Sequence, residues 1–341
     1  MKYYITPTFI LFLFLLSCNT NKTNSWEDRT YNLSGEKIAL NHFFYSPRGL
    51  CIKDSILLIN DFNSDTIFYV YNINEKPIKL IYSFGTKGEG PDEYIFPAPL
   101  RINKNNICFY DRSLYKYQTI DLSNKNVYSE RVSPVGFYNI IKISDNTYVG
   151  DGFFPDSRFK LLQEDSCSNL SIQYPDDNIN CSSTQKALVY QGNIIKQPNG
   201  KKFVYVATYG GIIEIYQITE NNIKSLCNKI YHFPQYTPYA HSQNEVSANL
   251  KKDNKKSNLS SYVTDKYIYV LYSGKTLSDP DHNFSNTVYV LDWNGMEVCK
   301  YVLDQSLSSI CVDCNDQFLY GLYYNTENEF EGLIKYKLTL L

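Results

Sequence analysis

Nine cysteines are the first candidates for reactive or metal-binding side chains in this sequence. Cys311 and Cys314 have the CxxC spacing of zinc and redox sites, but strand-like sequence flanks them and no second CxxC or HxxxH pair accompanies them. We therefore expect neither a zinc site nor a redox centre at this pair. Cys167 and Cys181 lie in a polar, loop-like region, and they are the best candidates for a structural disulfide.

Carboxylates could also bind a metal ion, and three aspartates occupy equivalent positions in the sequence. Asp61, Asp111 and Asp151 each close an apolar run that a polar turn follows. An aspartate in that position commonly caps the turn by accepting backbone N–H hydrogen bonds. The segment Asp279–His282 is similarly expected to be a solvated polar turn. No metal site is predicted from these residues.

The charge balance argues against nucleic acid as a partner. The 341 residues include 33 Lys and Arg against 35 Asp and Glu, which gives a net charge of −2 at pH 7. A chain without a basic surplus lacks the electrostatic attraction that drives nucleic-acid binding. The glycine-rich segment around Gly88 lacks the GK[ST] ending and the following helix of a phosphate-binding loop. We expect no cofactor.

Residues 1–17 are predicted to be a signal peptide. The apolar run Phe9–Leu16 is far shorter than the roughly 20 residues that a membrane-spanning helix needs. It ends in Leu-Leu-Ser-Cys at Cys18, which resembles the lipobox of bacterial lipoproteins, in which the cysteine is acylated and becomes the first residue of the mature chain. This resemblance implies that a lipid on Cys18 holds the protein on a membrane. A plain secretory signal with an incidental cysteine is the alternative.

The residues after Cys18 are polar and have no apolar period, so we expect a flexible tether over residues 18–30 and a single domain over residues 31–341. Asn19 follows the cysteine, and no acidic pair comes directly after it as in surface-export signals. We therefore expect an outer-membrane lipoprotein whose domain faces the periplasm.

The body of the chain repeats one pattern six times, namely a β-rich run, a polar turn and a second β-rich run. The repeats begin near residues 56, 107, 147, 203, 267 and 318, so the mean spacing is about 52 residues, close to one propeller blade. Shorter β-like runs flank each pair and bring each unit to four strands. The sequence predicts an all-β fold, a six-bladed β-propeller of four-stranded antiparallel blades. Two stacked β-sandwiches are the alternative, but they would not need a fixed four-strand unit.

The last blade is expected to take its outer strand from the other end of the chain. Leu341 follows directly after the third strand of the sixth unit. The unassigned stretch Glu36–Phe44 can supply the fourth strand, so an N-terminal strand would close the ring and cover an exposed sheet edge. We expect a monomer.

A glycine-rich segment carries a family resemblance. The segment Phe84–Tyr94 (FGTKGEGPDEY), followed by Phe96 and Pro97, resembles the inter-blade signature of NHL-type propellers. Together with the three strand-ending aspartates and the lipobox, it makes the mature chain similar to six-bladed, TolB-like propeller lipoproteins of the Bacteroidota. The resemblance implies a fold and an envelope address, but no single activity.

The long connections between strands all fall in one kind of position. In a four-strand meander with strands A to D, the B–C turns and the connections from D to the next A lie on one face of the ring. The four long connections are of these two kinds: Phe84–Pro97, Pro175–Leu188, Pro234–Asn258 and Ser273–Asn286. Long loops on one face of a rigid scaffold are the usual place for binding. We predict a binding site on that face, formed by Tyr236, Tyr239, His241 and, near the mouth of the central channel, Arg48 and Arg101.

Three classes of function remain, and non-catalytic binding is favoured. A metal-dependent hydrolase or lactonase would need carboxylates near the channel, but the six runs expected to be innermost contain no Asp or Glu. A GxSxG nucleophile motif is absent as well, so no catalytic residue is predicted. A purely structural envelope component is the third class. The lysine run Lys251–Lys256 is either a solvated loop or an attraction for an anionic partner. The sequence does not choose among an envelope protein, a peptide and a glycan.

Overall fold

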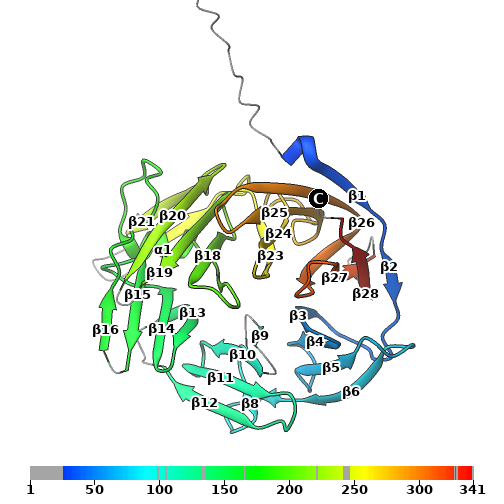
Figure 1. The fold of residues 1–341 in the computed structure, drawn as a ribbon. Coiled ribbons are helices and arrows are strands. Elements are labelled where there is room, and N and C mark those ends of the chain that lie inside the picture. Colours follow the sequence, from blue (N-terminus) through cyan, green and yellow to red (C-terminus); the bar gives the residue numbers. More distant parts are fainter. Residues whose placement is uncertain are drawn as a thin grey trace, which may run out of the picture.

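The computed structural model describes residues 26–97, 100–103, 106–132, 136–164, 166–219, 222–240, 246–325, 327 and 329–339. Its strands form six four-stranded antiparallel units that surround a central axis (Figure 1). In each unit the first strand lies nearest the axis and the fourth lies at the perimeter. The predicted six-bladed β-propeller is confirmed.

The blades follow one another along the chain, and blades 5 and 6 share a strand. Blade 1 contains β3 (Pro47–Lys53), β4 (Ile56–Asp61), β5 (Phe68–Asn72) and β6 (Lys79–Phe84). Blade 2 contains β9 (Arg101–Asn103), β10 (Asn106–Asp111), β11 (Lys116–Asp121) and β12 (Val127–Arg131). Blade 3 contains β13 (Phe137–Ser144), β14 (Thr147–Gly152), β15 (Phe159–Gln163) and β16 (Ser166–Asn169). Blade 4 contains β17 (Gly192–Lys196), β18 (Lys202–Ala207), β19 (Ile212–Ile218) and β20 (Ile223–Ile230). Blade 5 contains β23 (Asn258–Val263), β24 (Tyr267–Tyr272), β25 (Ser285–Asp292) and the first part of β26 (Glu297–Val312). Blade 6 contains the last part of β26, β27 (Phe318–Tyr324), β28 (Phe330–Lys337) and β2 (Glu36–Ile38).

The two ends of the chain close the ring, as the sequence predicted. Strand β2 pairs antiparallel with β28, with Glu36 opposite Lys335 and Ile38 opposite Leu333. A second N-terminal strand, β1 (Thr30–Leu33), pairs parallel with β26 at the edge of blade 5. N-terminal residues therefore cover the outer edges of two neighbouring blades.

The predicted boundary between tether and domain is wrong. The short 3-10 helix η1 (Trp26–Arg29) already packs on blade 5, where the Trp26 ring stacks on Tyr289 at 4.1 Å. The Trp26 Nε1–H donates to the carbonyl of Val290 at 3.3 Å, and Arg29 Nη2 donates to the carbonyl of Glu297 at 2.8 Å. Residues 26–30 belong to the folded domain because this aromatic contact holds them. Cys18 and the predicted signal peptide lie outside the described residues.

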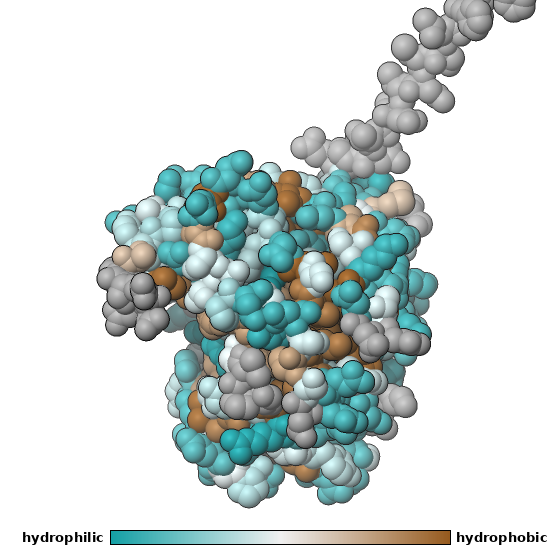
Figure 2. Space-filling view, turned by 90° about the vertical axis from the view of Figure 1, so that its left-hand side faces the viewer, coloured by the Kyte–Doolittle hydropathy of each residue, from teal (hydrophilic) through white to brown (hydrophobic). Residues whose placement is uncertain are grey.

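Burial differs between the middle and the outer strands. Strands β4, β10, β14 and β18 each bury five of their six residues. Neighbouring blades cover both faces of these strands, so their sequences are nearly continuous apolar runs. The outer strand β6 instead alternates exposed and half-buried residues. The perimeter that faces the viewer in Figure 2 is accordingly mostly hydrophilic, with hydrophobic side chains between the polar ones.

The long connections lie on one face, as predicted, and they carry extra elements. The connection from β6 to β9 contains the short strands β7 (Thr86–Lys87) and β8 (Glu93–Tyr94). The connection from β16 to β17 contains the helix α1 (Ser183–Val189), which begins with a capping box of Ser182 and Gln185. The connection from β20 to β23 contains the hairpin of β21 (Tyr236–Ala240) and β22 (Val246–Leu250).

Two of the three strand-ending aspartates cap turns, as the sequence predicted. Asp61 accepts hydrogen bonds from the backbone N–H groups of Tyr45, Ser46 and Asn63. Asp111 accepts from those of Ile95, Phe96, Ser113 and Leu114. Each carboxylate thus ties its own B–C turn to the preceding connection between blades. Asp151 differs, because it accepts from the backbone and the side chain of Asn139 on the inner strand of its own blade.

Candidate functional site

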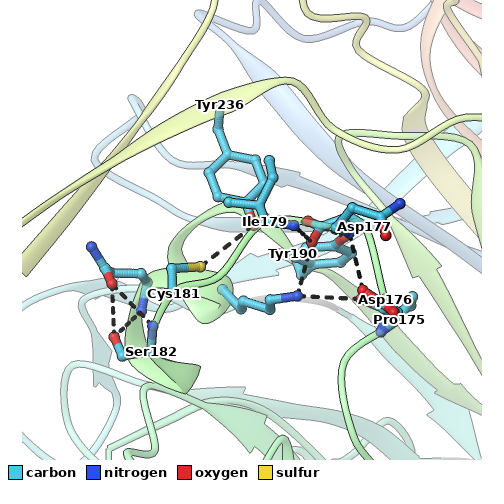
Figure 3. Close-up of polar contacts among 11 residues, drawn as sticks. Pro175, Asp176, Asp177, Ile179, Cys181, Ser182, Tyr190 and Tyr236 are labelled. Atoms are coloured by element: carbon cyan, nitrogen blue, oxygen red, sulfur yellow. Dashed lines mark hydrogen bonds and ion pairs between the residues drawn. The ribbon is translucent and has the colours of Figure 1, made fainter.

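The predicted site residue Tyr236 lies in a closed hydrogen-bond network around Asp177 (Figure 3). The Tyr236 and Tyr190 hydroxyls donate to Asp177 Oδ2 at 2.7 and 2.8 Å, and Lys186 Nζ donates to Oδ1 at 2.9 Å. Burial alone would raise the pKa of Asp177, but the hydrogen bonds from Lys186, Tyr236 and Tyr190 hold it below its usual value. Tyr236 is buried and its hydroxyl already donates to Asp177, so it presents little surface to a ligand.

This network fastens the connection before blade 4 to the hairpin β21–β22. The Gln185 side chain on α1 donates to the carbonyls of Tyr239 and Ser247, one on each strand of the hairpin. The Tyr239 side chain is 46% exposed and remains a candidate for contact with a ligand. His241 lies outside the described residues.

The predicted Cys167–Cys181 disulfide is not formed. Both cysteines are free thiols. Cys167 packs against the apolar cluster around Phe137, whereas the Cys181 sulfur lies 3.6 Å from the Tyr236 hydroxyl. Cys311 is buried in β26, and Cys314 is exposed in the turn after it.

A cavity of about 780 Å³ opens on the face of the long connections, and we call it the long-loop cavity. Its walls come from the segment before β3, from the start of β23 and from the B–C connections of blades 5 and 6. The residues that shape it are Phe43, Tyr45, Arg48, Lys256, Phe284, Tyr324, Glu329 and Phe330. The cavity therefore lies where the ring closes, between the N-terminal segment and the last two blades.

Aromatic side chains form much of this wall, and two of them are unusually open to solvent. Phe43 and Tyr45 are 73% and 67% exposed, and their rings meet edge to face at 5.1 Å. The Tyr324 ring lies 4.8 Å from Phe284 and 5.5 Å from Phe330. The Tyr324 hydroxyl donates to the carbonyl of Pro47 at 2.9 Å, which fixes this ring against the start of β3.

The long-loop cavity also has a positive wall. Arg48 is exposed, and Lys256 Nζ donates to the side-chain oxygen of Asn283. Burial, and then the nearby Arg48 charge, lower the pKa of Lys256. Among the described residues, neither cation forms an ion pair with a carboxylate. Glu329 is the one carboxylate among the residues that line the cavity.

Arg101 lines a different cavity, of about 430 Å³, which we call the channel cavity. Its walls are the inner strands β9, β13, β17 and β23, together with β10 and β11 of blade 2. Asp145, Gln197 and Pro198 from A–B turns also line it, so it extends toward the face opposite the long connections. Arg48 and Arg101, which the sequence places together near the channel mouth, therefore line separate cavities.

Within the described part of the chain, the Arg101 guanidinium donates hydrogen bonds only to carbonyl groups. Its Nη1 donates to the Leu100 carbonyl at 2.8 Å, and its Nη2 donates to the Ile194 carbonyl of blade 4 at 3.4 Å. Burial lowers the pKa of Arg101 to about 10, so the side chain stays charged at neutral pH. Burial also lowers the pKa of Lys196, which lines the same cavity.

The inner strands carry only positive charge. As the structure delimits them, β3, β9, β13, β17, β23 and the blade 6 part of β26 contain no Asp or Glu, as expected from the sequence. The same strands carry five cations, namely Arg48, Lys53, Arg101, Lys142 and Lys196. Sequence reasoning missed Lys142 and Lys196, although counting the cations of the inner strands would have found them. In the described part of the chain, no three His, Cys, Asp or Glu side chains gather as metal ligands.

Comparisons with known proteins agree with this architecture. A family model described as "TolB-like 6-blade propeller-like" matches residues 30–315. A member of the DUF4221 family from Bacteroides vulgatus superposes with a TM-score of 0.55 at 10% identity, covering 91% of this chain and 96% of that chain. A Bacteroides fragilis protein described as exported superposes with a TM-score of 0.52 at 13% identity, covering 90% of this chain and 98% of that chain. At these identities the two likenesses concern the fold alone. None of the curated proteins compared with the chain matches its sequence.

Proposed function

We propose that this chain, which belongs to the TolB-like 6-blade propeller-like family, is a non-catalytic binding protein of the cell envelope. In this proposal it holds an acidic segment of a protein partner in the long-loop cavity. The observation that carries it is the combination of strongly exposed aromatic rings at Phe43 and Tyr45 with the cations Arg48 and Lys256 in one cavity.

The chemistry of this wall suits a protein segment. Exposed aromatic side chains with a neighbouring arginine are the residues that most often dominate protein–protein binding energy. Large apolar side chains left in solvent also mark interaction sites. Two cations against the single carboxylate of Glu329 favour an acidic partner and speed its approach.

Acylated Cys18 would hold the domain close to a membrane. Seven residues separate Cys18 from Trp26, where the described part of the domain begins. A fully extended chain spans about 3.6 Å per residue, so blade 5 would lie within about 30 Å of the lipid. No helix in the described ranges is long and apolar enough to cross a membrane. Mass analysis of the protein from a membrane fraction should show a lipid-sized increment on Cys18, and an unmodified soluble chain would reject the anchor.

Photo-crosslinking in intact cells tests the binding site. A photoreactive phenylalanine analogue at position 43 is expected to capture a protein partner. The same analogue at position 128 should not, because exposed Tyr128 lies on the outer strand of blade 2. Adding Arg48→Ala and Lys256→Ala should weaken capture at position 43 about tenfold or more. The matched pair Lys79→Ala and Arg131→Ala, two exposed cations on outer strands, should leave it unchanged. Equal capture at both positions, or capture of glycan alone, would reject the proposal.

A further inference from the structure

We propose that the channel cavity is a second binding site, which takes a small organic anion carrying a carboxylate or a phosphate. Arg101 and Lys196 would contact the anionic group. This inference does not rest on the long-loop cavity, because the two cavities share no lining residue.

The cavity lies beside the inner strand of blade 2 and reaches the second and third strands of that blade. Strand β9 spans three residues, whereas β13, the inner strand of the next blade, spans eight. From β10 and β11, Cys108, Tyr117 and Thr119 reach the cavity.

Arg101 keeps hydrogen-bonding capacity for a ligand. A guanidinium has five N–H groups arranged to bind a carboxylate or a phosphate through two parallel hydrogen bonds. In this protein two of them have partners, the carbonyls of Leu100 and Ile194. These two contacts hold the side chain across the channel from blade 2 to blade 4. They provide no negative charge to balance it.

The other charges around the cavity do not neutralise Arg101. Lys142 Nζ is already paired with Glu130 at 2.7 Å and lies 4.0 Å from Asp145, whose side chain is in solvent. Among the residues that the structure describes, neither Arg101 nor Lys196 has a carboxylate within ion-pair distance. Both side chains are half-buried, where a charge without a partner is costly, and a bound anion would supply that partner.

Two hydroxyl groups of the wall are also free to donate a hydrogen bond. The Ser261 hydroxyl oxygen accepts from Asn193 at 3.3 Å and from Asn258 at 3.5 Å, so its own proton is free to be donated. The Thr119 hydroxyl accepts from the Cys108 thiol at 3.8 Å, which leaves its proton free in the same way. Tyr262 is an exception, since its hydroxyl donates to the carbonyl of Ile52. The free hydroxyl protons of Ser261 and Thr119, together with the charges of Arg101 and Lys196, favour an anion over a neutral molecule.

The volume of the cavity sets the size of the ligand. At about 430 Å³ it falls within the range of about 300–1,000 Å³ that is usual for small-molecule sites. This space fits a molecule of monosaccharide size. Glucuronate and glucose 6-phosphate are therefore suitable probes, and glucose is the neutral control of the same size.

Calorimetric titration of the purified mature chain tests the site. Glucuronate, glucose 6-phosphate or both should bind at millimolar concentration or better, and glucose should not. Arg101→Met and Lys196→Met should each weaken binding of the anion about tenfold or more, since each removes a charge-assisted hydrogen bond to the ligand.

Two substitutions serve as controls for this titration. Lys53→Met removes a cation of an inner strand that lies outside the cavity and pairs with Asp54, and it should leave binding unchanged. Arg48→Ala should do the same, because Arg48 lines the other cavity. If Arg101→Met does not fold, Lys196→Met decides by itself. The proposal is overturned if neither anion binds better than glucose, or if folded variants of the two cavity cations bind as the wild type does.

Discussion

Arg158 and Arg101 are both enclosed by the propeller, but they have different partners. Arg158 lies at the end of the B–C connection of blade 3, and its side chain is 1% exposed. Its two terminal nitrogens donate to the two carboxylate oxygens of Glu214 on β19, and its guanidinium lies 4.5 Å from the Tyr205 ring. Arg101 has two carbonyl groups and no carboxylate.

The difference separates structural charges from charges that are available to a ligand. At Arg158 the protein itself supplies a complementary anion, so a ligand would gain nothing there. The same holds for Asp177, whose carboxylate is matched by Lys186, Tyr190 and Tyr236. At Arg101 and Lys196 the complementary charge is missing. A burial measurement alone would not distinguish these cases, whereas an inventory of hydrogen-bond partners does.

Removing the partner of Arg158 should have the largest effect. Glu214→Ala leaves a buried guanidinium without its anion, and the free energy of unfolding should fall by about 3–5 kcal/mol. Denaturant unfolding measures it. Glu331→Ala is the matched control, because Glu331 pairs with Lys37 at an exposed position, and its loss should cost about 1 kcal/mol or less. Equal losses for the two glutamates would contradict the structural role of the Arg158 pair.

Opening the Asp177 network should cost somewhat less. Asp177→Ala removes the acceptor of two tyrosine hydroxyls and of Lys186, and we expect a loss of about 2–3 kcal/mol in the same measurement. Asp176→Ala is the control, since Asp176 is exposed and accepts one hydrogen bond, from the Asn178 backbone N–H. If both variants are equally stable, the network does not hold the hairpin to blade 4.

The buried carboxyl group of Asp151 should make the stability of the protein depend on pH. Burial raises its pKa to about 7, although the hydrogen bond from Asn139 and the charge of nearby Arg158 act in the opposite direction. A carboxyl group whose pKa is higher in the folded than in the unfolded state stabilises the fold at low pH and loses that contribution as the pH rises through about 7. The melting temperature of the wild type should therefore fall between pH 4 and pH 8 relative to that of Asp151→Asn. Parallel pH profiles would show that Asp151 is ionised in the folded protein throughout.

The smallest effect on stability is expected at Arg101. Arg101→Met removes a cation that no carboxylate balances, and it gives up two hydrogen bonds to carbonyls. These terms oppose each other, so the free energy of unfolding should change by less than about 1 kcal/mol. Arg158→Met should cost several times more. If Arg101→Met is as damaging as Arg158→Met, Arg101 is a structural link across the channel and the comparison fails.

Features that depend on neighbouring residues could be predicted, and features that depend on distant ones could not. Asp61 and Asp111 cap turns because their carboxylates accept from N–H groups that are 16 residues away or fewer along the chain. Tyr236 looked like a loop aromatic open to solvent, but Asp177, 59 residues earlier, binds its hydroxyl. Trp26 looked like part of a polar tether, yet it donates to a carbonyl 264 residues away.

The sequence by itself determined the six blades, the face of the long connections and the strand that closes the ring. These follow from β-rich runs and from polar turns, which extend over a few positions and recur along the chain. Only the tertiary structure decided which charges meet. Arg48 and Lys256 share a cavity because closure of the ring brings blade 1 near the start of blade 5. Arg101 reaches blade 4 because the inner strands converge on one axis. Whether a charge has a partner depends on such distant contacts, and no local pattern encodes them.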